Sequence, residues 1–187
     1  MRRWDGGWLA VTLEPGGARK VRRASLRALA RLGLRAGPGG LWLRPDNLAT
    51  CLADTRQHLA LLGLEEGSEA FIARDFGELI ERHLRTDLWP VNALQAGHEQ
   101  ALQALERSLE RLPSLTRAAA LVETYLLGGQ AIRVLAADPL LPEEIMAGDP
   151  RRDLTERMLE YDAIGHCLWS EVASQPHLEL VGGQHAG

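Results

Sequence analysis

The residues that could coordinate a metal ion gather near the C-terminal end of the sequence. Asp162, His166 and Cys167 lie in a segment of helical periodicity, and a spacing of four residues places Asp162 and His166 on the same helix face. Carboxylate, imidazole and thiolate groups all bind zinc, but structural zinc sites use four ligands. Two such residues on one helix are more often a hydrogen-bonded surface pair. We therefore predict no metal site and no cofactor.

The sequence contains none of the standard enzyme signatures. It lacks a phosphate-binding glycine loop followed by lysine, a serine elbow, paired CxxC motifs and an HExxH motif. Glu143 and Glu144 follow Pro142, where acids stabilise the positive end of a helix dipole without any acid–base role. We predict that the chain is not an enzyme, and we assign no catalytic residue.

A basic amphipathic helix is predicted from Arg19 to Leu32, with Gly33 as its C-cap. Most of its cations lie opposite its apolar residues, where they could neutralise the phosphates of DNA or of a phosphorylated ligand. Because no aromatic residue for base stacking lies among them, a solvated helix face is the alternative. The candidate phosphate or DNA-backbone contacts are Arg19, Lys20, Arg22, Arg23 and Arg27.

Residues 1–75 are predicted to form a ferredoxin-like β-α-β-β-α-β domain of the α+β class, in which an antiparallel sheet carries two helices on one face. Alternation, helical spacing and turn residues predict each element in turn. The expected elements are a strand in 4–13, a helix over 19–32, a hairpin of 34–36 and 41–44, a helix capped by Asp46 or Asn47 and ending near Gly63, and a strand over 69–73.

A helical second domain is predicted over residues 76–174. Its helices are expected at 78–85, 90–112, 115–136 and 152–172, separated by proline-containing turns. Gly128 and Gly129 either break the third of these helices or pack inside it as small residues. Residues 175–187 are predicted to be a mobile tail.

Charge and cysteine content indicate a cytoplasmic protein with two differently charged parts. Residues 1–56 carry eleven basic and four acidic residues, whereas 57–187 carry ten basic and twenty-one acidic residues. Cys51 and Cys167 lie far apart in the sequence, which indicates reduced cytosolic thiols and not the disulfide framework of a secreted protein. The segment from Met1 to Leu13 lacks the apolar region of a signal peptide, and no stretch reaches the ~18 apolar residues of a membrane-spanning helix.

Several local strings occur together in an order typical of one protein family. The sequence resembles the PaaX family of bacterial transcriptional repressors, which control phenylacetate degradation, over residues 3 to about 172. The strings are RWDGGW at 3–8, LGL at 32–34, GGLWLRP at 39–45, DLW at 87–89, and IR at 132–133 followed by DPLLP at 138–142.

The resemblance implies a ferredoxin-like central domain, akin to a small CRISPR-associated nuclease, and a helical C-terminal domain. It further implies a homodimer whose repression is relieved by an aryl-CoA thioester such as phenylacetyl-CoA. Family members bind operator DNA through an N-terminal winged helix, which this sequence lacks, so we expect either a fragment or a shortened relative. Arg133 is the candidate effector contact, because the CoA phosphates need a cation and Arg133 lies beside the DPLLP turn in an otherwise strongly acidic domain. The alternative is that Arg133 pairs with Asp138 or another acid and that no pocket exists. The family tends to have a tyrosine-arginine pair before the DP-x-LP string, of which this sequence retains only the arginine.

Three functions remain open at this point. The first is a regulatory, non-enzymatic module that dimerises and senses an aryl-CoA. The second is a metal-dependent nuclease of ferredoxin-like fold, although Thr12 stands where the related nuclease fold has a metal-binding aspartate. The third is an interaction protein without a small ligand. Metal-dependent cleavage of nucleic acid would identify the second, and thermal stabilisation by CoA thioesters would separate the first from the third.

Overall fold

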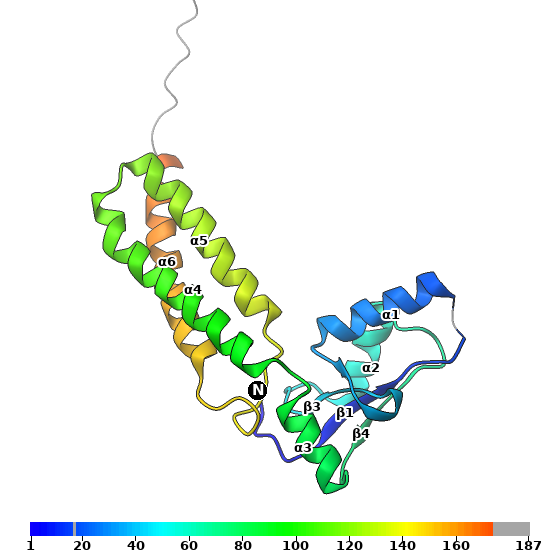
Figure 1. The fold of residues 1–187 in the computed structure, drawn as a ribbon. Coiled ribbons are helices and arrows are strands. Elements are labelled where there is room, and N and C mark those ends of the chain that lie inside the picture. Colours follow the sequence, from blue (N-terminus) through cyan, green and yellow to red (C-terminus); the bar gives the residue numbers. More distant parts are fainter. Residues whose placement is uncertain (17, 174–187) are drawn as a thin grey trace, which may run out of the picture. The chain divides into compact units, whose positions relative to one another are not determined.

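The computed structural model describes residues 1–16 and 18–173 (Figure 1). Contacts divide the chain into two compact units. Unit 1 comprises Met1–Ala96 and Ala137–Asp149, and unit 2 comprises Gly97–Ala136 and Pro150–Gly187. The tail predicted at 175–187 lies outside the described residues.

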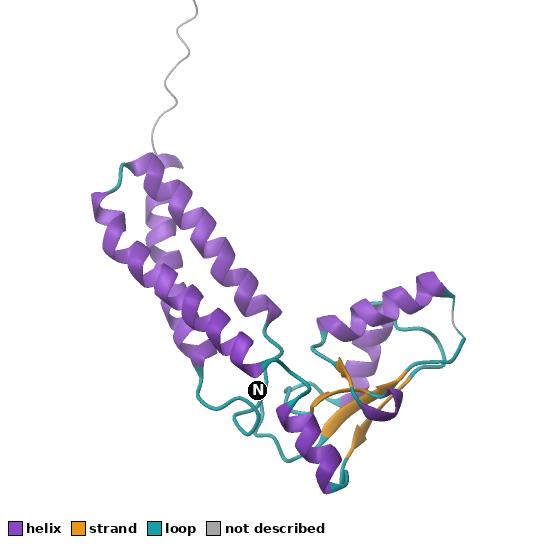
Figure 2. Cartoon of the chain, viewed as in Figure 1, coloured by secondary structure: helices purple, strands orange, loops and turns teal. Residues whose placement is uncertain are grey.

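Unit 1 is built on a four-stranded antiparallel sheet with the strand order β2-β3-β1-β4 (Figure 2). A helix follows β1, and another follows β3. In chain order the elements are β1 (Trp8–Thr12), α1 (Arg19–Arg31), β2 (Arg35–Ala36), a short 3-10 turn (Pro38–Gly40), β3 (Trp42–Pro45), α2 (Leu52–Leu61), β4 (Glu69–Ala73) and α3 (Glu78–Thr86).

Strand β1 shows how the sequence covers both faces of the sheet. Because successive side chains of a strand point to opposite faces, Leu9 and Val11 pack with the buried face of α1, whereas Trp8 and Ala10 join a separate core cluster. All four side chains are buried. The strand therefore contributes to two cores at once, which explains its nearly continuous apolar sequence.

The first core lies between the sheet and helices α1 and α2. Helix α1 contributes Ala28 and Leu29, and α2 contributes Leu59, each with an exposed fraction of 1% or less. Burying side chains of this size contributes about 1.5–3 kcal/mol each for the leucines. Because α1 packs on the sheet through this apolar face, its opposite, polar face is exposed to solvent.

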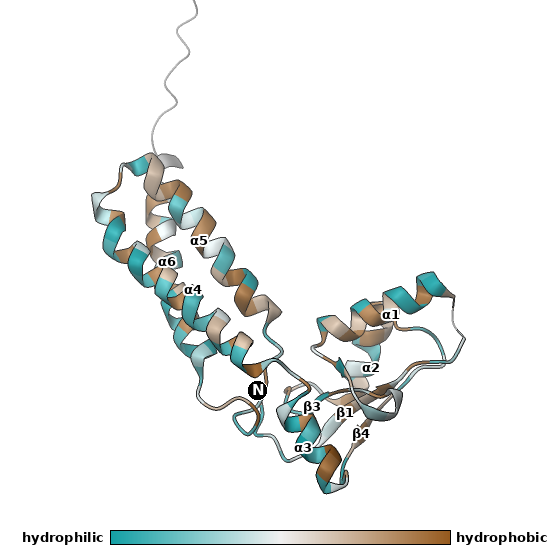
Figure 3. Ribbon diagram, viewed as in Figure 1, coloured by the Kyte–Doolittle hydropathy of each residue, from teal (hydrophilic) through white to brown (hydrophobic). Residues whose placement is uncertain are grey.

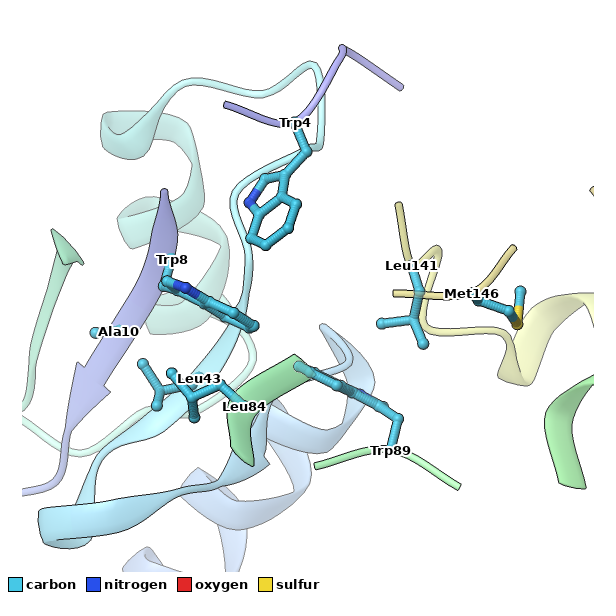
Figure 4. Packing of buried hydrophobic residues seen from close by; sticks show 8 residues of the cluster. All are labelled: Trp4, Trp8, Ala10, Leu43, Leu84, Trp89, Leu141 and Met146. Atoms are coloured by element: carbon cyan, nitrogen blue, oxygen red, sulfur yellow. The ribbon is translucent and has the colours of Figure 1, made fainter. Parts of the chain in front are cut away.

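The second core is formed around three tryptophans (Figure 4). The rings of Trp4 and Trp8 meet edge to face at 5.2 Å, and Trp8 stacks on Trp89 at 6.2 Å. The guanidinium of Arg85 lies over the Trp4 ring at 4.8 Å, and the Trp8 indole donates to Glu81 at 3.2 Å. Three of the five tryptophans are thus core residues of unit 1.

Helix α2 begins later than the sequence predicts. Neither Asp46 nor Asn47 caps it; the Cys51 sulfur accepts from the Asp54 amide at 3.4 Å and takes that role. Asn47 is buried; its Oδ1 accepts from Arg44 Nη2 at 3.1 Å, and its Nδ2 donates to the Leu140 carbonyl at 2.7 Å. The side-chain oxygen of Asn47 that could cap a helix is thus engaged by Arg44.

Unit 2 is helical in its described part. It contains most of α4 (Val91–Arg111) and of α5 (Arg117–Ala137), a 3-10 turn (Leu112–Ser114) and α6 (Pro150–Ala173). Leu105, Leu154 and Tyr161 are fully buried in its core. Helix α5 continues through Gly128 and Gly129, so these residues pack inside the helix and do not break it.

The contacts divide the chain at residue 96/97 instead of 75/76, where a boundary was expected. Leu84 of α3 and the following Trp89 belong to the tryptophan core of unit 1, because their side chains cover the sheet face opposite α1 and α2. Leu141 and Met146 join the same core, so 137–149 also belongs to unit 1.

Across 1–16 and 18–173, no helix is both long and apolar enough to span a membrane.

Candidate functional site

Three glycines open a groove between α5 and α6 in unit 2. A Cβ atom added to Gly128 would lie 3.3 Å from Met158 Cε, and one added to Gly165 would lie 3.7 Å from the Thr124 Cβ. The absence of side chains therefore lets the two helices approach closely while leaving space beside Gly129. This α5/α6 groove has a volume of about 310 Å³.

Aromatic and aliphatic side chains border the α5/α6 groove. Tyr125 and Ile132 on α5 are 72% and 54% exposed, and Trp169 on α6 is 49% exposed. Large apolar side chains in such positions lose hydration when a ligand or partner covers them. The groove therefore has an apolar lining with aromatic groups at its edges.

Arg133 lies on the exposed surface of α5 beside this groove. Its Nη1 is 3.6 Å from the point where a Cβ of Gly129 would stand. Within the described ranges, Arg133 makes neither a hydrogen bond nor an ion pair, while the Asp138 carboxylate accepts from the Leu140 amide at 2.5 Å. An exposed guanidinium in this state can bind a phosphate or carboxylate without first breaking an internal contact.

A second groove lies on the other side of α5, beside the C-terminal end of α4. This α4/α5 groove has a volume of about 600 Å³. It is lined by Arg111, Ala118, Ala119, Val122, Glu123, Leu126, Leu127 and Gln130. Val122 and Leu126 are large hydrophobic residues that remain mostly exposed.

Helix α5 therefore carries an apolar surface between two grooves. Val122 is three residues from Tyr125 and four from Leu126, and Ile132 follows Tyr125 by seven, spacings that place the four residues on one side of the helix. We call these four residues the α5 ridge. Figure 3 shows hydrophobic positions along the length of α5. A helix with apolar residues on all sides is normally covered on all sides.

A buried polar network fixes α5 against α4 and α6. Ser108 donates to Glu123 at 2.6 Å and contacts the Tyr161 hydroxyl at 2.8 Å, and Arg111 pairs with Glu123 at 2.7 Å. Burial alone would raise the pKa of Glu123, but the bonds from Ser108 and Arg111 outweigh it and lower that pKa. Burial raises the pKa of Tyr161. Glu123 is thus a charged structural group.

The candidate metal-binding residues do not form a ligand set. His166 and Asp162 face each other at 3.7 Å on exposed positions of α6, and Cys167 is also exposed. No three His, Cys, Asp or Glu side chains among the described residues gather closely enough to hold a metal ion. Thr12, at the end of β1, donates its hydroxyl to the Glu69 carbonyl at 3.5 Å. The metal-dependent nuclease stays a prediction that these observations do not favour.

Three of the strings that carry the family resemblance meet in unit 1. The Arg44 guanidinium donates to the carbonyls of Leu32 and Pro139 and to the Asn47 side chain, and Asn47 donates to Leu140. Arg44 is only 3% exposed, and desolvation lowers its pKa to about 10. This Arg44 junction joins the LGL, LWLRP and DPLLP strings, so these strings contribute to the fold of unit 1.

The candidate phosphate contacts are spread along α1. Arg19, Lys20, Arg23 and Arg27 are exposed, whereas Arg22 is half-buried and pairs with Glu65 at 2.5 Å. Arg22 therefore stabilises unit 1 internally.

Sequence reasoning did not identify the α5 ridge, although the helix predicted over 115–136 has apolar residues on every side, which was a signal for it.

The comparisons with known proteins show a similar fold only. No family model and no curated protein matches the sequence. Its structure is similar to that of the uncharacterized protein Rv0674 from Mycobacterium tuberculosis, with a TM-score of 0.59 and 18% sequence identity. The similarity covers 90% of this chain and 65% of that protein, so the chain spans about two thirds of its neighbour's length.

Proposed function

We propose that the chain is the regulatory part of a PaaX-like transcriptional repressor. In this proposal it is a non-enzymatic module that dimerises and senses an aryl-CoA thioester, and a separate winged helix reads the operator. The strand order β2-β3-β1-β4, with helices after β1 and β3, supports a ferredoxin-like classification of unit 1. The Arg44 junction supports the family resemblance, because its strings form one bonded unit.

The observation that carries the proposal is the exposed α5 ridge between two grooves. Helices associate when the ridge of one enters the groove of another. A second copy of this chain offers the same ridge and the same grooves, and two-fold dimers use one self-complementary surface on both subunits. We therefore assign dimerisation to the side of the ridge that carries Val122 and Leu126 over the α4/α5 groove.

The α5/α6 groove is the proposed effector site. Its volume of about 310 Å³ lies at the lower end of the range for ligand pockets, which suits an aryl group better than a whole CoA molecule. The aryl group would lie between Tyr125 and Trp169, and the CoA phosphates would extend over the surface toward Arg133. Binding there would shift the population of the repressor toward the state that fits the ligand.

Dimerisation is tested by sedimentation of the full chain at micromolar concentration. The native chain should sediment as a dimer, and Leu126→Asp should sediment as a monomer because the substitution places a charge in the proposed interface. Leu159→Asp is the matched control: Leu159 is a similarly exposed leucine on α6, outside the ridge. A native chain that stays monomeric at 100-fold higher concentration would refute the dimer assignment.

Effector binding is tested by calorimetric titration with phenylacetyl-CoA and with free CoA. The native chain should bind the thioester more tightly than CoA. Gly129→Leu should abolish this difference by filling the groove, whereas Gly97→Leu, at an open position on α4, should preserve it. Arg133→Ala should weaken the binding of phenylacetyl-CoA and of free CoA about equally. No heat of binding at millimolar thioester would remove the sensing role.

A further inference from the structure

Four arginines form a regular row on α1. Arg19, Arg23, Arg27 and Arg31 follow one another at intervals of four residues, and all four are exposed. Each interval corresponds to a rise of about 6 Å along the helix, so the row is about 18 Å long. Lys20 lies beside its first member. We call these four residues the arginine row.

The arginine row is unfavourable for the helix that carries it. Like charges four residues apart repel one another, and cations in the first turn oppose the helix dipole. Helix α1 has no acidic residue in its first turn, and Ala18 at its N-cap provides no side-chain hydrogen bond. Only Arg31, in the last turn, is favourably placed with respect to the dipole. Local helix stability therefore does not explain the row.

Some arginines on other helices of the described chain have acidic partners, although the exposed Arg133 on α5 has none. On α3, Arg82 pairs with Glu78 at 3.1 Å, and on α6 Arg157 pairs with Glu160 at 2.6 Å. None of the four row arginines makes a hydrogen bond or an ion pair with any residue in 1–16 or 18–173. The row is thus a line of uncompensated positive charge, ready to bind an external anion.

The packing of α1 against the sheet favours a nucleic acid over a membrane as the source of that anion. Ala28 and Leu29 are buried against the sheet, and the Ser25 hydroxyl accepts from the Glu65 amide at 2.9 Å. An amphipathic helix that lies in a bilayer interface inserts its apolar face among the lipids. The apolar face of α1 is already occupied, so the helix presents a rigid cationic line.

We propose that the arginine row binds the phosphate backbone of a nucleic acid. A duplex strand carries one phosphate per about 3.4 Å of axis, so the row spans about five phosphates and can contact about four of them. Guanidinium groups form paired hydrogen bonds to phosphate oxygens. Because α1 carries no aromatic residue for stacking, the contact is to the backbone and is independent of base sequence. This role goes beyond effector sensing and belongs to unit 1.

The test measures binding of the full chain to fluorescent 20-base-pair duplexes of two unrelated sequences across a salt series. Four phosphate contacts predict a slope of about −3.6 in log K against log salt, or about a 150-fold loss of affinity from 50 to 200 mM salt. Both sequences should bind equally. A single-stranded 20-mer that uses the same contacts should give a slope of about −2.8.

Two double variants that lose the same charge distinguish binding by the arginine row from a general effect of net charge. Arg23→Gln with Arg27→Gln should weaken binding and reduce the duplex slope by about 1.8. Arg82→Gln with Arg152→Gln removes the same total charge from other exposed helix positions and should leave the slope unchanged. Circular dichroism should show that both variants keep the native helix content, because glutamine is also a good helix former.

Four outcomes would overturn the proposal. These are no duplex binding at 50 mM salt, equal weakening by the two double variants, strong preference for one of the two sequences, and tighter binding to vesicles of anionic phospholipid than to the duplex. The last result would assign the row to a membrane surface.

Discussion

The Arg44 guanidinium donates a hydrogen bond to the Pro139 carbonyl, 3.3 Å away, although 95 positions separate the two residues in the chain. Both lie in unit 1, which the segment 137–149 rejoins after α5. A would-be Cβ on Gly33 would lie 3.4 Å from both Arg44 Nη1 and Pro139, so the glycine makes room for this contact. The positive φ of Gly33, 78°, adds a second reason for glycine there.

We expect Arg44→Lys to destabilise unit 1 by about 2–4 kcal/mol. A lysine ammonium cannot serve the Leu32, Asn47 and Pro139 oxygens in the planar arrangement that a guanidinium provides. Each buried oxygen that loses its donor costs about 1–3 kcal/mol. Urea unfolding followed by tryptophan fluorescence measures the loss. Arg35→Lys, at an exposed position on β2, is the control, and an equally large effect there would contradict this explanation.

The two adjacent glycines of α5 should respond in opposite directions to substitution. Gly128→Leu should cost about 1–3 kcal/mol by overpacking, because Gly128 is buried against Met158 and Tyr161. Gly129→Ala should instead stabilise unit 2 by about 0.5–1 kcal/mol, since it removes glycine from a helix interior without a close contact. Thermal unfolding of both variants decides the matter. Destabilisation by Gly129→Ala would show that the groove is more tightly packed than this structure indicates.

The pKa of Glu123 predicts a pH dependence for unit 2. Because the bonds from Ser108 and Arg111 lower this pKa in the folded state, the charged carboxylate adds stability above the unfolded pKa near 4.5. That stability is lost as the pH falls through the lower, folded pKa. Denaturant unfolding between pH 6 and pH 3 should therefore show a steeper acid loss in the native chain than in Glu123→Gln. Parallel curves for the two proteins would contradict a structural role of the charge.

The tryptophans should separate into core and surface classes. Trp89→Ala should cost about 3–5 kcal/mol, because Trp89 is 2% exposed and stacks on Trp8. Trp169→Ala should cost less than about 1 kcal/mol, since half of that side chain is exposed. Chemical unfolding measures both costs. Acrylamide should quench Trp169 in the native chain but not Trp89, and equal quenching would count against the buried cluster.

Local sequence was sufficient to predict most elements. The strand expected at 69–73 matches β4, and the helix expected at 19–32 matches α1 to within one residue. Periodicity of two or of about 3.6 residues specifies which face of an element is apolar, and that face must be buried. Breakers such as Gly33 then set where the element ends. These signals need no knowledge of distant parts of the chain.

Tertiary structure alone decided how individual side chains are used. The local sequence around Asn47 resembles a helix cap, but the Arg44 guanidinium occupies the side-chain oxygen that would cap the helix. Arg22 and Arg23 are neighbours in one basic helix, yet Glu65, brought close by folding, pairs with Arg22 alone. By sequence Asp138 is an alternative partner for Arg133, but its carboxylate accepts from the Leu140 amide of its own turn. A side chain's partner depends on which groups the packed cores bring within about 3 Å, and spacing along the chain does not contain that information.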